Sequence, residues 1–351
     1  MSYRCYSSLS FVPRHVLPRF NIPKSDFKGH QVKAIKKFKK LSPGLNMLIE
    51  LRDIRAPLST RNVIFDNILR SNRSLERLVV YTKKDMTSGN ANGKQYFKKL
   101  SQWHAQLNEK FIILDGRDTS DAKQLLKILQ WENHKVESRG MRLPLGYRAF
   151  IAGMPNVGKS TLVNTLRRVT NPSSSGTKFK KVARTGSEAG VTRSTSEVIR
   201  LMPTTNNSSP IYLIDSTGVG LPGRLTNQNR MLTLSMCGAV KTSLIEPVIQ
   251  ADYLLYLMNL QNPLPGAEWY PKYKSEPTND IYEVLRRLAK NKESFDENVV
   301  ATNWVNKWRL DSKNLLFDVE TLLPADAFSY RDYVDKQLEE LGELTFLRER
   351  K

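Results

Sequence analysis

The sequence of 351 residues has little cysteine and no long apolar run. Its two cysteines, Cys5 and Cys237, cannot make a disulfide framework, and no CxxC or Cys/His cluster indicates zinc. A reducing compartment is the simplest interpretation. No apolar stretch approaches the ~20 residues that a membrane-spanning helix needs. The best candidate, ADYLLYLMNL at 251–260, is far shorter and predicts a buried helix or strand.

Acidic residues are also scarce. The chain has 34 Asp and Glu against 55 Lys and Arg, which gives a formal net charge of +21. Such an excess favours an anionic partner, either nucleic acid or an anionic membrane surface. A basic protein without a polyanionic partner is the remaining alternative. The hydrophobic fraction of 40% is enough for packed cores and excludes a disordered chain.

The N-terminal segment lacks acidic residues altogether before Asp26. Residues 1–25 carry Arg4, Arg14, Arg19 and Lys24 among serine and apolar residues. This composition is typical of a mitochondrial transit peptide, and it lacks the long apolar core of a secretory signal. A basic arm that binds RNA is the alternative. We therefore expect a transit-like leader at 1–25 and a location in the mitochondrion.

Apolar runs then alternate with amphipathic segments. Strands are predicted at 45–53, 75–85, 109–118, 147–153, 195–202 and 210–218, and helices at 29–41, 61–72, 92–108, 119–136 and 161–169. This alternation predicts an α/β fold in which helices cover both faces of a parallel sheet. The last two strands are expected to form a hairpin. We expect this domain at 26–240, a smaller mainly helical domain at 241–330, and a helical tail at 331–351.

The stretch GMPNVGKST at 153–161 is a P-loop, because Gly153, Gly158, Lys159 and Ser160 match GxxxxGK[ST] between a predicted strand and a predicted helix. Lys159 would reach the outer phosphates of a nucleotide, and the Ser160 hydroxyl would ligate Mg²⁺. The helix N-terminus adds its positive dipole end. Backbone N–H groups of the loop would face the phosphates, and they belong to Asn156, Val157, Gly158, Lys159, Ser160 and Thr161.

YTKKD at 81–85 indicates GTP rather than ATP, because it matches the [NT]KxD element at a strand end. Asp85 would accept two hydrogen bonds from guanine, and adenine would leave that carboxylate unpaired. The stem of Lys83 would pack along the base. Thr82 stands where Asn is commoner, so one hydrogen bond in the nucleotide pocket is expected to be weaker or rearranged.

LIDSTGVG at 213–220 supplies a DxxG element after another strand. Asp215 would hold Mg²⁺ through water, and the Gly218 N–H would contact the γ-phosphate. The next residue is Val219, which cannot orient water as the Gln of many small GTPases does. Thr192 in GVTRST is the candidate switch threonine that would close on Mg²⁺ and the γ-phosphate, with Thr195 as second choice.

The order of these motifs is unusual, because TKKD precedes the P-loop and DxxG comes last. Circular permutation of one GTPase domain explains this order, since the termini of a domain often lie close together and can be rejoined. LDGRD at 114–118 then fits the remaining guanine-contacting loop, with backbone N–H groups around Gly116 facing the base.

In this order of motifs the sequence resembles the circularly permuted YlqF/RbgA-type GTPases, which assist assembly of the large ribosomal subunit, and most of all their mitochondrial branch. The resemblance covers roughly residues 26 to 325 and rests on GHQVKA, LIELRDIRAPLS, YTKKD, GMPNVGKST, GVTRST and DSTGV. It implies that His30 of GHQ, which matches the family's usual Gly-His-Met segment except for Gln31 in place of Met, positions the attacking water, or else that it has a structural role. It also implies that Asn156 binds K⁺, or else only shapes the loop. Asp53 and Arg55 of ELRDIRAPLS are a candidate structural ion pair.

The resemblance and the motifs together predict a GTP-hydrolysing assembly factor that needs Mg²⁺ and uses K⁺. Its expected partners are the mitochondrial large ribosomal subunit and its rRNA, with peripheral contact to the inner membrane and no transmembrane segment. Two alternatives stay open. One is an RNA-binding assembly scaffold with vestigial hydrolysis, and the other is a GTPase whose lysines at 33–40 bind a membrane surface.

Overall fold

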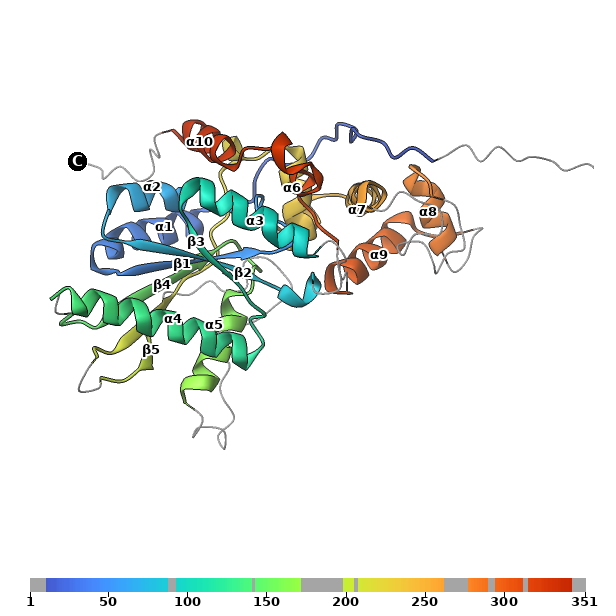
Figure 1. Ribbon diagram of the computed structural model, residues 1–351. Helices are drawn as coiled ribbons and strands as arrows, with labels where there is room; N and C mark the ends of the chain where they lie inside the picture. Colours follow the sequence, from blue (N-terminus) through green and yellow to red (C-terminus); the bar gives the residue numbers. More distant parts are fainter. Residues whose placement is uncertain are drawn as a thin grey trace, which may run out of the picture.

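The computed structural model describes residues 11–87, 93–140, 143–171, 198–204, 208–261, 277–289, 294–311 and 315–342 (Figure 1). Six strands form one sheet in the order β3-β2-β1-β4-β6-β5. The strands are β1 (Met47–Asp53), β2 (Glu76–Thr82), β3 (Lys110–Ile113), β4 (Tyr147–Gly153), β5 (Val198–Met202) and β6 (Ile211–Asp215). Neighbours pair in parallel, apart from the antiparallel hairpin of β5 and β6.

The pairing of β1 with β4 joins the two halves of the α/β region into one sheet, since β1 to β3 come first in the chain and β4, the P-loop, β5 and β6 come after them. The predicted parallel α/β fold and the predicted hairpin are therefore confirmed. Four strands, β1, β2, β3 and β6, are shorter than predicted, whereas β4 spans the predicted residues. β3, for example, ends at Ile113 because the polar residues that follow leave the sheet for a loop.

Helices cover both faces of the sheet (Figure 1). On one face lie α1 (Gly29–Leu41), α2 (Ile64–Ser71) and α3 (Gly93–Leu107), and on the other lie α4 (Thr119–Ser138) and α5 (Lys159–Thr170). Phe38 of α1 holds the first face together, because its ring stacks on Phe150 of β4 at 4.5 Å and meets Phe65 of α2 edge-on at 5.9 Å. Such aromatic contacts add to the burial of apolar area.

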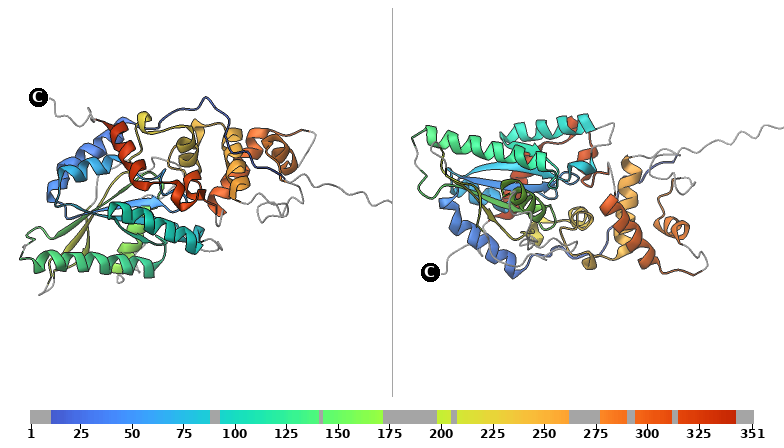
Figure 2. Two further views of the ribbon diagram at one scale, coloured as in Figure 1. Left: turned by 45° about the horizontal axis from the view of Figure 1, so that its top comes forward. Right: turned by 90° about the horizontal axis from the view of Figure 1, so that it is seen from below.

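In the described residues after β6, the regular elements are helices. They are α6 (Gln228–Met236), α7 (Pro247–Gln261), α8 (Ile281–Leu288), α9 (Glu297–Asp311) and α10 (Tyr330–Leu341). The stretch ADYLLYLMNL lies in α7, which is buried on nearly all sides and therefore shows no apolar period. Figure 2 shows α7, α8 and α9 as a group at one end of the sheet, whereas α10 returns to pack near α2 and α3. Within the described ranges, no helix combines the length and the apolar character that crossing a membrane requires.

Residues 11–25, which fall within the predicted leader, run along α6 and α7. Leu17 is buried, and the Arg14 guanidinium donates to the backbone oxygen of Asp252 at 2.8 Å and pairs with its carboxylate. The Phe20 N–H donates to the side chain of Gln228 on α6. This segment thus contributes to the packing of the helical region.

Candidate guanine-nucleotide site

Four loops that carry the predicted nucleotide motifs lie at the carboxyl edge of the sheet. The guanine motif begins at Thr82, the last residue of β2, and the loop at 114–118 follows β3. The P-loop begins at the end of β4, and the DxxG element begins at Asp215, the last residue of β6. In open parallel sheets, ligands bind outside the carboxyl ends of the strands. The structure therefore brings the motifs from both sides of the permutation to one place.

The P-loop has the backbone that phosphate binding needs. Gly153 has φ 152° and Gly158 has φ 96°, and Asn156 also lies in the left-handed region at φ 57°. A Cβ on Gly153 would stand 2.5 Å from the carbonyl oxygen of Leu51, so only glycine fits between the loop and β1. The loop then runs directly into the N-terminus of α5, with its orphan N–H groups and positive dipole end.

Lys159 points into the P-loop. Its Nζ donates to the carbonyl oxygens of Gly153 at 3.2 Å and of Met154 at 2.6 Å. Burial lowers the pKa of Lys159 to about 8, although the carboxylate of Asp215 acts in the opposite direction. A phosphate group would supply the negative charge that this buried ammonium needs. Ser160 and Thr161 occupy the first turn of α5, and both are half-buried.

Gly218 packs directly against the P-loop. A Cβ there would lie 2.8 Å from both the N and the Cα of Pro155, so glycine is required for this close approach. The following N–H, that of Val219, donates to the Gly153 oxygen at 3.1 Å. The DxxG segment and the P-loop are thus in contact through their backbones.

Thr82 joins the guanine motif to the P-loop. Its hydroxyl donates to the carbonyl oxygen of Val157 at 2.6 Å and lies 3.2 Å from that of Arg52. Where Asn is commoner in GTPases, this chain thus has a Thr whose hydroxyl donates a hydrogen bond to the P-loop. The shorter Thr side chain suits the close approach of Gly158, whose Cβ position is 3.5 Å from Thr82.

Lys83 has a left-handed backbone with φ 62°, and its ammonium lies 2.7 Å from the Asp53 carboxylate at the end of β1. Asp53 is fully buried and also accepts two bonds from the Arg55 guanidinium, at 3.1 and 2.9 Å. The predicted ion pair of Asp53 and Arg55 is therefore present. The Arg55 guanidinium also donates a hydrogen bond to the carbonyl oxygen of Arg309, near the end of α9, at 3.1 Å.

Asp85 and the LDGRD loop face each other. The Arg117 guanidinium lies 2.7 Å from the Asp85 carboxylate and 2.9 Å from that of Asp115. Gly116 is buried, and its Cβ position is 3.6 Å from the backbone nitrogen of Leu162 on α5. The loop expected to contact the base thus lies between the guanine motif and the helix that follows the P-loop.

The residues after the DxxG element are held by two side chains that sequence reasoning did not assign. The Asn62 amide donates to the carbonyl oxygens of Val219 at 2.9 Å and of Gly220 at 3.2 Å. Gln31 of α1, in turn, accepts a hydrogen bond from the Gly220 N–H. The only signal in the sequence for Gln31 was its departure from the Gly-His-Met pattern, and nothing pointed to Asn62.

His30 and Val219 differ in exposure. The Val219 side chain is buried. His30 is exposed and lies next in the chain to Gln31, so α1 places it close to the segment that follows Gly218. Thr192 and its alternative Thr195 lie outside the described residues.

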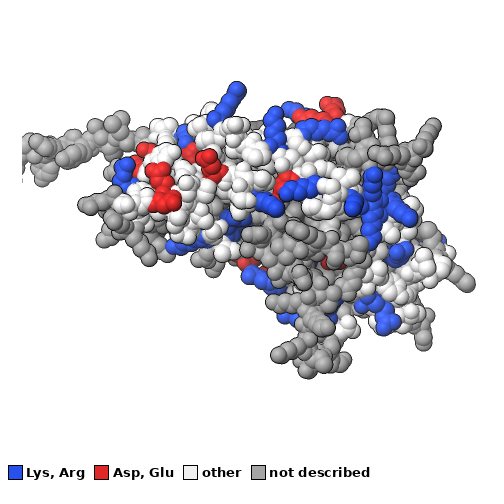
Figure 3. All heavy atoms as spheres, turned by 180° about the vertical axis from the view of Figure 1, so that it is seen from behind, with Lys and Arg blue, Asp and Glu red and all other residues white. Residues whose placement is uncertain are grey.

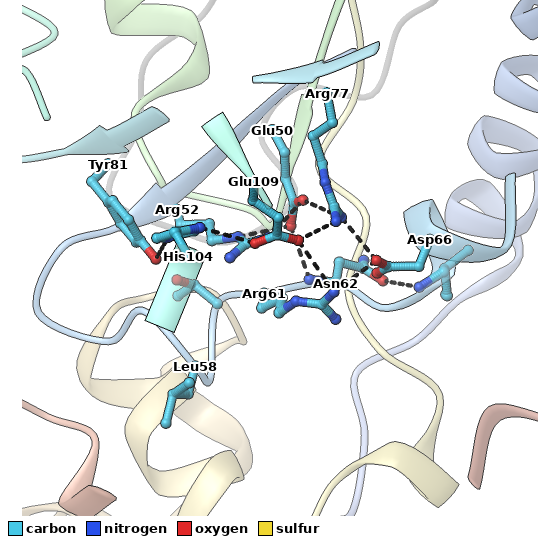
Figure 4. A network of polar contacts seen from close by, with 12 residues as sticks. Glu50, Arg52, Leu58, Arg61, Asn62, Asp66, Arg77, Tyr81, His104 and Glu109 are labelled. Carbon is cyan, nitrogen blue, oxygen red and sulfur yellow. Dashed lines mark hydrogen bonds and ion pairs between the residues drawn. The ribbon is translucent and has the colours of Figure 1, made fainter. Parts of the chain in front are cut away.

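A cluster of buried charges supports the loop that ends at Asn62 (Figure 4). Glu50 and Arg52 of β1 pair at 2.9 Å, and Arg77 of β2 reaches Glu50 at 3.3 Å and Asp66 at 2.9 Å. Glu50 also accepts the Asn62 N–H at 3.2 Å. Further members of the cluster are Arg61, Tyr81, His104, Glu109 and Tyr330. Three arginines therefore balance three carboxylates, which fixes the loop without leaving net charge in the core.

Two groups that suit Mg²⁺ stand at the carboxyl edge of the sheet, where β4 leads into the P-loop and β6 ends. Ser160 supplies a hydroxyl and Asp215 a carboxylate, which are hard oxygen donors of the kind that Mg²⁺ binds together with nucleotide phosphates. In the described ranges no group of three or more His, Cys, Asp or Glu forms a separate metal site. The donor set therefore fits a metal that is shared with a bound nucleotide.

Comparisons with known proteins agree with this geometry. Residues 148–302 match the family described as 50S ribosome-binding GTPase. Mitochondrial GTPase 1 of Saccharomyces cerevisiae is 57% identical over 340 residues, covering 96% of this chain and 92% of that protein. Mitochondrial ribosome-associated GTPase 1 of Xenopus tropicalis is 30% identical over 269 residues, covering 75% and 78%.

A bacterial relative is similar to the same extent. Ribosome biogenesis GTPase A of Bacillus cereus is 30% identical over 269 residues, covering 76% of this chain and 81% of that protein. The strand order, with the guanine motif before the P-loop in one sheet, agrees with a permuted GTPase domain. The chain therefore belongs to the circularly permuted GTPase family of mitochondrial GTPase 1 and ribosome biogenesis GTPase A.

Proposed function

We propose that this GTPase is an assembly factor for the large subunit of the mitochondrial ribosome, and that it supports mitochondrial translation in this way. The observation that carries the proposal is the convergence of four guanine-nucleotide motifs, from both halves of the permuted chain, at one sheet edge. The relatives support the partner, since one is named a ribosome-associated GTPase and another a ribosome biogenesis GTPase. The net charge of +21 suits a partner made largely of RNA.

In this proposal the base and the phosphates are bound by different loops. Thr82, Lys83, Asp85 and Gly116 select guanine. Gly218 contacts the γ-phosphate, and the phosphate-binding residues of the P-loop are Asn156, Val157, Gly158, Lys159, Ser160 and Thr161. Mg²⁺ would be held by Ser160, Asp215 and Thr192, and it would neutralise charge on the β- and γ-phosphates.

Water positioning needs a group other than Val219, and we assign it to His30. K⁺ would be held by Asn156 of the P-loop, whose amide nitrogen donates to the Gly238 oxygen at 2.8 Å. A monovalent cation there would neutralise charge that develops between the phosphates, as an arginine finger does. In this proposal His30 positions the attacking water and Asn156 binds the cation that neutralises charge, two roles that no DxxG side chain fills.

The nucleotide state would reach the partner through the helical region at 241–330, which follows the DxxG element and α6 in the chain. Arg55 connects the guanine motif with the helical region, since it donates to Asp53, which contacts Lys83, and to the carbonyl oxygen of Arg309 on α9. We place the protein on the matrix side of the inner membrane as a peripheral protein. The leader at 1–25 and the tail at 331–351 complete the proposed organisation.

GTP turnover tests the proposal. Rates are measured with and without purified mitochondrial large subunits, in K⁺ and in Na⁺, for the wild type and for His30→Ala. We expect stimulation by subunits in K⁺, and a large loss of the stimulated rate in His30→Ala with GDP binding retained. GTP and GDP forms that bind subunits equally well, with no stimulation, would instead support a scaffold with vestigial hydrolysis.

A further inference from the structure

The outer face of α1 carries an unusual charge. Five lysines occur in this helix of 13 residues, with no acidic residue among them. Lys33, Lys36 and Lys40 are exposed and Lys37 is half-buried, and none of these four forms an ion pair with any residue in the described parts of the chain. Lysines three and four positions apart repel one another, by roughly 0.2–0.5 kcal/mol per pair. The folded chain thus keeps a row of charges that destabilises its own helix.

Helices α4 and α10 carry acidic residues beside their basic ones. On α4, Lys135 lies 3.4 Å from Glu132, and Asp121 and Glu137 are further acidic residues of the same helix. On α10, four acidic residues stand against two basic ones. Helices α3 and α5 also lack acidic residues, but each has three basic residues, so the excess of five is larger on α1.

The basic surface extends beyond α1. The Asn72 amide donates to the carbonyl oxygen of Ser42 at 2.6 Å, which brings the end of α1 next to the turn that follows α2. Arg70 and Arg73 near that turn are exposed. In Figure 3, Lys and Arg side chains gather at the right of the molecule, on the end where α1 and α2 lie.

We propose that this face of α1 binds the phosphate backbone of double-helical RNA without reading its sequence. Flexible lysines act as point charges toward phosphate, whereas sequence reading needs side chains that reach base edges. An RNA double helix offers a dense array of phosphates to a row of this kind. The inference rests on the proposed function and names the part of the protein that meets the RNA.

A membrane fits this helix less well. Helices that bind in a lipid interface insert an apolar face below the headgroups. On α1 the apolar face is already used, because Ile35 and Phe38 are buried against the sheet and α2. The lysines lie on the outer side of the helix, so lipid would gain charge contacts without insertion.

The face also has a link to the nucleotide site. Gln31, in the first turn of α1, accepts the Gly220 N–H two residues after Gly218. The same helix carries Gln31 and Lys40, so RNA bound along α1 would shift the position of Gly220 and, through it, of Gly218, which we expect to contact the γ-phosphate. The proposed RNA surface is thus coupled to the site of GTP binding.

The test compares two variants of the full chain that are matched in charge and spacing. Lys36→Gln/Lys40→Gln removes two exposed lysines from α1, and Lys123→Gln/Lys127→Gln removes two exposed lysines at the same spacing from α4. Gln is nearly as good a helix former as Lys, and removal of like charges relieves repulsion, so both variants should fold. Fluorescence anisotropy measures binding to a short blunt RNA duplex across a range of salt concentrations.

We expect the α1 variant to lose about tenfold in duplex affinity and its salt slope to fall by about two units, while the α4 variant stays close to wild type. Equal losses in both variants, or no duplex binding by the wild type, would overturn the inference. So would loss of binding to vesicles of phosphatidylcholine and cardiolipin in the α1 variant with unchanged RNA binding.

Co-sedimentation with mitochondrial large subunits separates this inference from the proposed function. Wild type that binds the RNA duplex through α1 and yet fails to sediment with subunits would contradict the proposed partner and leave the RNA face standing. An α1 variant that sediments with subunits as well as wild type, and binds the duplex as well, would contradict the RNA face alone.

Discussion

Asp53 stabilises the guanine motif through its contact with Lys83, and replacement of Asp53 by Asn tests this role. The carboxylate is fully buried and contacts two cations, the Arg55 guanidinium at 2.9 and 3.1 Å and the Lys83 ammonium at 2.7 Å. Asn keeps the shape of the side chain and removes its charge. Arg55, which is also buried, would then keep a positive charge with no carboxylate beside it.

The expected cost follows from burial. Removing one partner of a buried ion pair costs about 3–5 kcal/mol, because the other charge stays in the core without compensation. The contact with Lys83 adds less, since that side chain is partly exposed and its charge is screened by water. We therefore expect Asp53→Asn to lower the free energy of unfolding by about 3–5 kcal/mol at pH 7.

The pH dependence has a definite sign. The neighbouring Arg55 and Lys83 hold the pKa of Asp53 well below its usual range, despite burial. The stabilisation is therefore fully present above the pKa of the unfolded chain, about 3.9, and is lost as the pH falls from there toward the lower folded pKa. The difference in stability between wild type and Asp53→Asn should shrink in that acidic range.

Urea unfolding and nucleotide binding together measure the effect. Besides the loss of stability, we expect weaker discrimination between mant-GDP and mant-ADP, because Lys83 loses the anchor that sets its position. A double-mutant cycle with Arg55→Met isolates the pair, and the double variant should be less damaged than the sum of the two single variants. An Asp53→Asn variant within about 1 kcal/mol of wild type, or strictly additive losses, would refute this reasoning.

Three further outcomes are expected. Arg14→Ala should lower the thermal midpoint, since it leaves the buried Asp252 carboxylate unpaired, and a chain that starts at Asp26 should be destabilised at least as much. Burial raises the pKa of Asp318 to about 7, so the folded state binds this proton more tightly than the unfolded chain. The free energy of unfolding of the wild type should therefore fall as the pH rises from about 4 to 7. In Asp318→Asn, urea unfolding should show a smaller change in stability over the same pH range. Thr82→Val should weaken mant-GDP binding about tenfold with little change in fold, because the side chain keeps its shape and loses only its hydroxyl contacts with the carbonyl oxygens of Val157 and Arg52.

The sheet could be predicted from sequence because its signals are local. Runs such as 45–53 and 147–153 are apolar, short and followed by polar motifs, and both proved to be central strands. The P-loop was recognisable for the same reason, since its glycines, lysine and serine are neighbours in the chain. In α7, by contrast, apolar residues cover all sides, so no period distinguished helix from strand.

Contacts that depend on distant parts of the chain could not be predicted. Lys83 meets Asp53 across 30 residues, and Arg52 donates to the Tyr330 hydroxyl across 278 residues at 2.9 Å. Neither contact leaves a pattern in a single sequence. Gln31 is the clearest example, because it counted only as a mismatch to a family pattern until the fold placed it against Gly220.

The permutation gives a physical reason why nucleotide state and partner binding should be coupled. The DxxG element follows β6 and leads directly into α6, whose Arg230 donates to the carbonyl oxygens of Ser59 at 3.2 Å and Arg61 at 2.8 Å. The same loop carries Asn62, which holds Val219. A shift of Gly218 toward a γ-phosphate would therefore act at once on α6 and on the loop after β1. In an unpermuted chain order the loop after DxxG would lead on to the guanine motif; here it leads to the helices that we expect to bind the ribosome.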